Sequence, residues 1–141
     1  MKKKSTSDLH NELISAPDLS RFLAENQDEF YNQDFSTLLQ CLFQKKNISK
    51  AALAKRAGMS DVYLYQIFSS GRKPSRNRII CLCFGLSATL DETQEMLKHS
   101  GHALLYAKDR RDAIIIYGLV HGMELTDTND MLFSESEATL F

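Results

Sequence analysis

The segment from Lys50 to Ser69 constrains the fold of this chain more than any other part. Two short stretches of helical character are separated there by a single glycine, Gly58. Ala54 lies four residues before the glycine, and Leu64 and Ile67 lie six and nine residues after it. A small residue permits two helices to approach closely, and a glycine accepts the positive φ of a tight turn. The spacing predicts two short helices that meet at a steep angle across a brief turn.

The remainder of the chain is also patterned for helices. Apolar residues recur at intervals of three and four, and no stretch alternates in the manner of a half-buried strand. Asp91 and Gln94 form a candidate capping box for a helix that ends near Gly101. We therefore expect an all-α protein. Its helix N-caps are expected at Asp18, Asp34, Ser49 and Ser60.

The composition is that of a globular protein with one core. The chain has 141 residues, of which 43% are hydrophobic and 25% are charged, and its net charge is −1. The longest apolar runs, residues 79–86 and 113–120, are much shorter than the roughly 18 residues of a membrane span. No apolar stretch follows the basic start, so no secretory signal is expected and the cytoplasm is the expected compartment.

The cysteines do not form a disulfide framework, because there are three of them. We expect Cys41, Cys81 and Cys83 to behave as small buried apolar residues. Neither they nor the four histidines have the spacing of metal ligands, so we expect no metal site and no cofactor. A nucleophile elbow and a phosphate-binding loop are also missing, so an enzyme is not expected.

The charges are strongly segregated along the chain. Residues 45–78 hold nine basic residues and one acidic residue, Asp61, for a local net charge of +8. A basic segment in an otherwise acidic chain suggests a surface for a polyanion. A solvated basic face that only aids solubility is the alternative.

A repeat with an offset of 35 residues joins the middle of the chain to its C-terminal part. Each copy is expected to form an apolar helix, a short connection and a second helix, and stacking the two hairpins would bury what one hairpin leaves exposed. The apolar run 113–120 is then either central core or a homodimer seam. Glu124, Asp127 and Asp130 form either a solvated acidic face or, less favoured, a metal site. The recurring residues are Lys73, Arg76, Ile79, Ile80, Leu90, Thr93, Met96 and Leu97, matched by Lys108, Arg111, Ile114, Ile115, Leu125, Thr128, Met131 and Leu132.

Residues 35–86, and less clearly the chain to about residue 100, resemble a Cro/cI-type (XRE) helix-turn-helix domain. The resemblance is carried by the string SKAALAKRAGMSDVYLYQIFSSGRKPSRNRIICLCFGL, residues 49–86. It implies a lambda-repressor-like five-helix domain over residues 34–100. Residues 1–33 are then expected to form a tail with short helices, and residues 101–141 a helical-hairpin extension on the same core. The matching positions are Leu53, Ala54, Gly58, Ser60, Leu64, Ile67, Gly71, Pro74, Gly85 and Leu86.

The resemblance also implies roles for individual side chains. The first motif helix would cross the DNA backbone, and the second would enter the major groove. Base-reading positions correspond to Ser60, Asp61, Val62 and Gln66. Positions that contact the DNA backbone correspond to Lys45, Lys46, Ser49, Lys50, Tyr63, Tyr65, Arg72, Lys73 and Arg76.

Two features of the second motif helix depart from the family pattern. Asp61 places a carboxylate where phosphates would face it, and Phe68 occupies a position that is usually polar in the family. Phe68 either turns back onto the Pro74–Ile80 segment as core or joins an aromatic patch for a protein partner. The sequence thus predicts a homodimeric transcriptional regulator that binds specific double-stranded DNA sequences. The alternative is a protein-interaction adaptor whose recognition helix has been reassigned.

Overall fold

The computed structural model describes residues 4–27, 35–70 and 73–141, and all regular structure in these ranges is helical. The expected cap Asp34 and the expected backbone contact Arg72 lie outside the described residues. The chain divides into two units, Met1–Asn32 and Gln33–Phe141. Within the described residues no helix is long and apolar enough to cross a membrane.

The first unit contains α1 (Thr6–Ser15) and α2 (Leu19–Glu25). Ser5 and Asp8 form a capping box at the start of α1, and the Asp18 carboxylate accepts a hydrogen bond from the Ser20 N–H at the start of α2. Phe22 is buried between the helices, and the buried Asn26 side chain donates to Glu12. This small hairpin is therefore tied together by polar contacts around one aromatic side chain.

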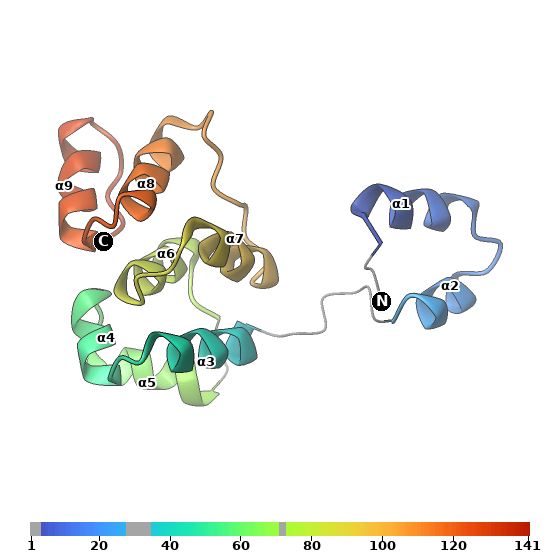
Figure 1. Cartoon of the computed structure of the whole chain (residues 1–141), viewed down its shortest axis with the longest axis horizontal. Helices are drawn as coiled ribbons and strands as arrows, with labels where there is room; N and C mark the ends of the chain where they lie inside the picture. Colours follow the sequence, from blue (N-terminus) through green and yellow to red (C-terminus); the bar gives the residue numbers. More distant parts are fainter. Residues whose placement is uncertain (1–3, 28–34, 71–72) are drawn as a thin grey trace. The chain divides into compact units, whose positions relative to one another are not determined.

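The second unit is built around α6, whose residues Ile79 to Gly85 are all buried. Helix α4 packs on one side of α6, and α7 and α9 also contact it. Gly85 permits the close approach of α4, because a Cβ there would lie 2.8 Å from Leu53 Cδ1. Figure 1 shows the order of these elements, from α3 in the first third of the chain to α9 near the C-terminus. The helices of this unit are α3 (Phe35–Lys46), α4 (Lys50–Arg56), α5 (Asp61–Ser70), α6 (Arg76–Gly85), α7 (Leu90–His99), α8 (Arg110–Val120) and α9 (Leu125–Ser134).

The hairpins α4–α5, α6–α7 and α8–α9 use the same turn. In each, the first helix is followed by a residue with positive φ, namely Gly58 (65°), Ser87 (52°) and Gly122 (66°). The next residue then donates its N–H to a carbonyl five positions back, at 2.9 Å in all three hairpins. This bond closes the end of a helix and sets the direction of the next one.

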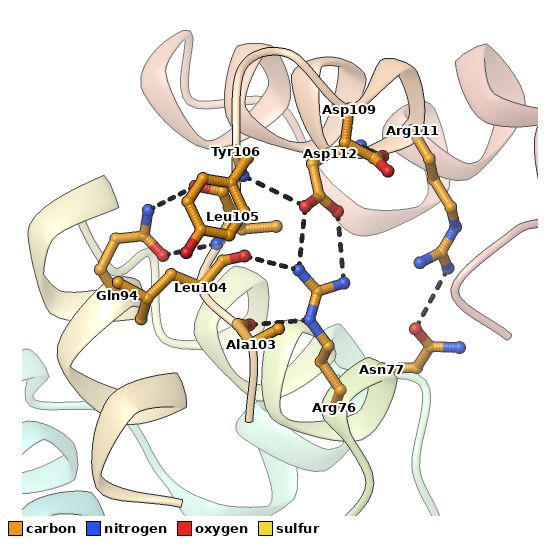
Figure 2. A network of polar contacts seen from close by, with 10 residues as sticks. All are labelled: Arg76, Asn77, Gln94, Ala103, Leu104, Leu105, Tyr106, Asp109, Arg111 and Asp112. Atoms are coloured by element: carbon orange, nitrogen blue, oxygen red, sulfur yellow. Dashed lines mark hydrogen bonds and ion pairs between the residues drawn. The ribbon is translucent and has the colours of Figure 1, made fainter. Parts of the chain in front are cut away.

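The 35-residue repeat extends into the polar contacts of the fold (Figure 2). Arg76 Nε donates to the Ala103 carbonyl at 2.9 Å, and Arg111 Nε donates to the Ala138 carbonyl at 2.7 Å. The Leu105 N–H donates to Gln94 Oε1 at 2.8 Å; one repeat later, the Leu140 N–H donates to Asn129 Oδ1 at 2.7 Å. Each hairpin is thus locked to the segment that follows it in the same way.

The two copies also exchange contacts. Arg76 pairs with Asp112 in the second copy, and Arg111 Nη2 donates to Asn77 Oδ1 in the first copy at 3.1 Å. Asn77 and Asp112 are themselves equivalent, 35 residues apart. Two reciprocal arginine contacts therefore join the α8–α9 hairpin to the α6–α7 hairpin.

Two details differ from the expectations. The capping box of α7 is formed by Thr89 and Glu92, two residues earlier than the expected pair Asp91 and Gln94. Cys41 is exposed, whereas Cys81 and Cys83 are buried. Burial raises the pKa of the Cys81 thiol to about 11 and that of the Cys83 thiol to about 12, so both are inert at neutral pH.

The apolar run 113–120 divides between core and surface. Ile115, Gly118 and Leu119 are buried, whereas Tyr117 and Val120 are exposed. A Cβ at Gly118 would overlap the Thr128 side chain of α9, so this position allows the two helices to approach closely. The run therefore supplies core on one side and leaves an exposed apolar stripe on the other.

Candidate nucleic-acid interface

Helix α5 buries one face and leaves the opposite face open. Leu64 and Ile67 are 1% and 0% exposed, so they anchor the helix in the core as the spacing predicts. The outer face presents two adjacent rows of side chains, because residues four positions apart are neighbours on the surface of a helix. The exposed members of these rows are Asp61, Val62, Tyr65, Gln66 and Ser69.

Two serines begin the helices of this hairpin as predicted. Ser49 Oγ accepts from the Ala52 N–H at 3.1 Å at the start of α4, and Ser60 Oγ accepts from the Tyr63 N–H at 3.1 Å at the start of α5. Both serines are exposed. Each hydroxyl group therefore has a structural role at a helix N-terminus, where backbone N–H groups and the helix dipole favour anions.

Phe68 packs inward, against a different element from the one expected. Its ring meets that of Phe43 on α3 edge to face, with 5.2 Å between centroids. Lys50 Nζ lies 4.9 Å from the Phe68 ring centroid, a cation–π geometry. The exposed apolar surface of α5 therefore consists of Val62 and Tyr65 without Phe68, and Lys50 is held at the N-terminus of α4.

A hollow opens between the start of α4 and the outer face of α5. Its lining is mainly apolar, although Lys50 stands on one side and Asp61 on the other. Val62 and Tyr65, which also line it, are 68% and 64% exposed. Four of the sequence-predicted residues, Lys50, Asp61, Val62 and Tyr65, thus line one hollow. The hollow is lined by Lys50, Ala51, Asp61, Val62, Leu64 and Tyr65.

Lys45 and Lys46 are engaged by an acidic residue that the sequence reasoning missed. Glu92 of α7 pairs with Lys45 Nζ at 3.0 Å and with Lys46 Nζ at 2.9 Å. Burial alone would raise the pKa of the Glu92 carboxyl, but the Thr89 N–H and the ammonium groups of Lys46 and Lys45 outweigh it and lower the pKa to about 2. The charge of this lysine pair is therefore partly neutralised within the protein.

Arg76 has a structural role that differs from the expected contact with the DNA backbone. Its guanidinium forms two hydrogen bonds with the Asp112 carboxylate, at 3.2 and 3.0 Å, and two more with the carbonyls of Ala103 and Leu104 (Figure 2). Its side chain is 23% exposed and that of Asp112 is 8% exposed. Four of its five donors thus bind protein groups, and the contact of Arg76 with the DNA backbone stays a prediction.

The other backbone candidates lie nearer to the surface. Lys73 is exposed, and it is the described cation directly after the C-terminus of α5. Tyr63 is half-buried against the core, with the Arg78 guanidinium 5.3 Å from its ring centroid. Arg78 was not among the expected site residues. Its contact with Tyr63 joins residues that are distant in the sequence, so no local sequence pattern indicates it. The surface around α5 therefore offers Lys50 and Lys73 as its clearest cations.

Residues 42–82 match the family model described as Helix-turn-helix. This segment is therefore similar to the Cro/cI-like helix-turn-helix family. The match covers α4 and α5 and reaches into α3 and α6. It supports DNA binding in general and confirms the resemblance drawn from Gly58 and its neighbours. No curated protein and no solved structure matches the chain.

Proposed function

We propose that this protein is a transcriptional regulator that binds specific double-stranded DNA sequences through its helix-turn-helix. Helix α5 would lie in the major groove, and the start of α4 would contact the backbone beside it. The protein would act in the cytoplasm. The observation that carries the proposal is the open outer face of α5, within a segment that matches the family, between the cations Lys50 and Lys73.

The charges on this surface set the expected strength and salt dependence of binding. Each phosphate neutralised by a lysine or arginine contributes about −0.9 to the log–log slope of affinity against salt. The internal pairs of Lys45, Lys46 and Arg76 leave fewer cations for phosphates than the nine in the sequence. A slope nearer −3 than −5, on the order of three contacts, is therefore expected.

The repeat provides a matched pair of variants to test the proposal. Lys73 and Lys108 are equivalent residues, both exposed, one beside α5 and one before α8. Lys73→Glu and Lys108→Glu change the net charge identically. On a random duplex of about 20 base pairs at about 50 mM salt, Lys73→Glu should weaken binding about tenfold, and Lys108→Glu less than twofold. Equal effects, or no binding by the wild-type protein, would refute the proposal.

The dimer is part of the same proposal. One α5 spans only a few base pairs, so two copies on a pseudo-palindrome would supply the length that a specific site needs. The exposed Tyr117 and Val120 on α8 support the C-terminal hairpin as the source of dimer contacts. Light scattering on the full chain, with and without duplex, should give the mass of two chains; a monomer in both conditions would remove this part of the proposal.

A protein-interaction adaptor is the second candidate function. The exposure of Val62 and Tyr65 beside a mainly apolar hollow favours it, since large exposed apolar side chains mark protein-binding surfaces. Tyr65→Ala would then abolish binding of a protein partner and leave affinity for random duplex unchanged. Regulation through DNA instead requires that Tyr65→Ala weaken binding to the protein's own DNA site.

A further inference from the structure

The outer face of α5 offers DNA an unusual set of groups at its N-terminal end. The first turn presents the Asp61 carboxylate, which only accepts hydrogen bonds, and the Val62 side chain, which is apolar. One turn later the Tyr65 ring is 64% exposed on the same side. A helix with a carboxylate and two apolar groups at this place discriminates strongly between base edges.

The major-groove edges of the bases respond differently to these groups. Guanine presents two acceptors, N7 and O6, which repel a carboxylate. Adenine places its acceptor N7 beside its N6 amino donor, whereas cytosine itself presents only its N4 amino donor. Thymine carries a C5 methyl group, which favours apolar side chains. The combination on α5 therefore matches pyrimidines: a donor for Asp61 and a methyl group for Val62 and Tyr65.

The hollow beside α5 independently supports contact with a methyl group. Val62 and Tyr65 border it together with Ala51 and Leu64, so most of its lining is apolar. Burial of a methyl group against such a lining is favourable because it removes apolar surface from water. Lys50 at the rim would meet the adjacent phosphate.

We propose that α5 selects pyrimidines, with Asp61 accepting a hydrogen bond from cytosine N4 and with Val62 and Tyr65 contacting the C5 methyl of a neighbouring thymine. This inference rests on the proposed function and adds to it the class of base that the helix reads. It also gives Asp61 a positive role in recognition, where its charge alone would only repel DNA.

The test begins with selection of binding sites from a pool of random duplexes by the full chain. The enriched half-site should contain a cytosine next to a thymine on one strand. Replacing that thymine by uracil removes only the methyl group and should weaken binding about fourfold. The Val62→Ala variant should bind the thymine and uracil duplexes almost equally, because the apolar contact is already reduced.

Asp61→Asn separates base reading from simple repulsion. An asparagine amide bonds the N6 and N7 groups of adenine in a bidentate manner, so the variant should prefer adenine at the position where wild type prefers cytosine. A uniform rise in affinity for every duplex would show that Asp61 only repels phosphate. That result, or equal binding of thymine and uracil duplexes by wild type, would overturn the inference while leaving DNA binding intact. Failure of wild type to enrich any site would overturn the proposed function as well.

Discussion

The hairpins α4–α5 and α8–α9 have the same turn geometry, but their second helices lie in surroundings of opposite charge. Gly58 and Gly122 have φ values of 65° and 66°, and the following methionine in each hairpin closes the turn with a 2.9 Å hydrogen bond. The second helix of the first hairpin lies beside Lys50 and Lys73. The second helix of the other carries exposed Asp127 and Asp130. A shared backbone turn therefore does not by itself make a DNA-binding surface.

The difference lies in what surrounds each second helix. A phosphate backbone attracts the cations near α5 and is repelled by the carboxylates of α9. The α8–α9 hairpin instead spends its basic residues on internal contacts: Arg111 binds the carbonyls of Ala138 and Thr139, and Arg110 pairs with Glu135. We interpret α4–α5 as the binding hairpin and α8–α9 as its structural support.

The largest effect on this comparison is expected from Arg76→Ala. The substitution leaves the Asp112 carboxylate, only 8% exposed, without its charged partner, and removes one of the two arginine links between α6 and α8. The free energy of unfolding should fall by about 3 kcal/mol. Urea denaturation followed by circular dichroism would measure it.

Arg111→Ala is the matched control for this loss, because Arg111 holds the equivalent carbonyls but pairs with a neutral residue, Asn77. Its cost should be about 1 kcal/mol. Equal costs for the two arginines would contradict the importance assigned to the Arg76–Asp112 pair.

Gly118→Ala should be the next largest perturbation. The added Cβ would overlap the Thr128 side chain, so α8 and α9 must move apart, at about 2 kcal/mol. Introducing the same change in a Thr128→Ala background should cost much less, since the overlapping atoms are gone. Thermal unfolding of the four proteins in this cycle gives the coupling, and strict additivity would rule out the close approach as the cause.

Lys50→Gln addresses the binding hairpin alone. Loss of one phosphate contact should reduce affinity for random duplex about fivefold at about 0.1 M salt and make the salt slope less negative by about 0.9. Lys108→Gln, on the repeat that supports the structure, should change neither quantity. Fluorescence anisotropy at several salt concentrations checks both; a slope unchanged by Lys50→Gln would place that lysine away from DNA.

Glu92→Gln should have the smallest effect on DNA affinity. It tests Lys45 and Lys46, whose charges Glu92 pairs with. Glutamine can keep the capping bond to the Thr89 N–H while removing the charge that pairs with the two lysines. If the lysines face DNA as the family resemblance implies, affinity for random duplex should rise about twofold.

The pH dependence of Glu92→Gln provides an internal check. The Glu92 pKa is lowered from 4.5 to about 2, so its charge stabilises the folded protein fully above about pH 4.5. That contribution is lost as the pH falls from 4.5 towards 2. Wild type and variant should therefore differ in urea midpoint at pH 6 and converge near pH 2. A difference that persists at pH 2 would assign the effect to the amide itself.

Local signals in the sequence predicted most of the fold. The spacing around Gly58 predicted the α4–α5 turn, Ser49 and Ser60 were recognised as caps, and Leu64 and Ile67 were expected inside. Such features depend on a few neighbouring residues, so short-range patterns are sufficient to find them. The Thr89–Glu92 capping box also has a local sequence signature, but the overlapping pair Asp91 and Gln94 has a similar one.

Long-range partners could not be predicted in this way. Arg76 has the same local context as a phosphate clamp, and its partner Asp112 lies 36 residues away. One signal did exist, because Arg76 recurs as Arg111 in the repeat. The second helix of the hairpin that carries Arg111 is acidic and unsuited to DNA. An arginine that occurs in both copies therefore favours a structural role over a contact with DNA. Phe68 similarly gave no indication that it would meet Phe43 of α3.

The central claim is that DNA binds the α4–α5 hairpin and not its structural counterpart. Hydrogen exchange of the full chain with and without a random duplex of about 20 base pairs at low salt tests it directly. The account predicts slower exchange of backbone amides in residues 49–69 on adding DNA, with residues 122–134 unchanged. Protection confined to residues 122–134, or none in residues 49–69 when DNA is bound, would contradict it.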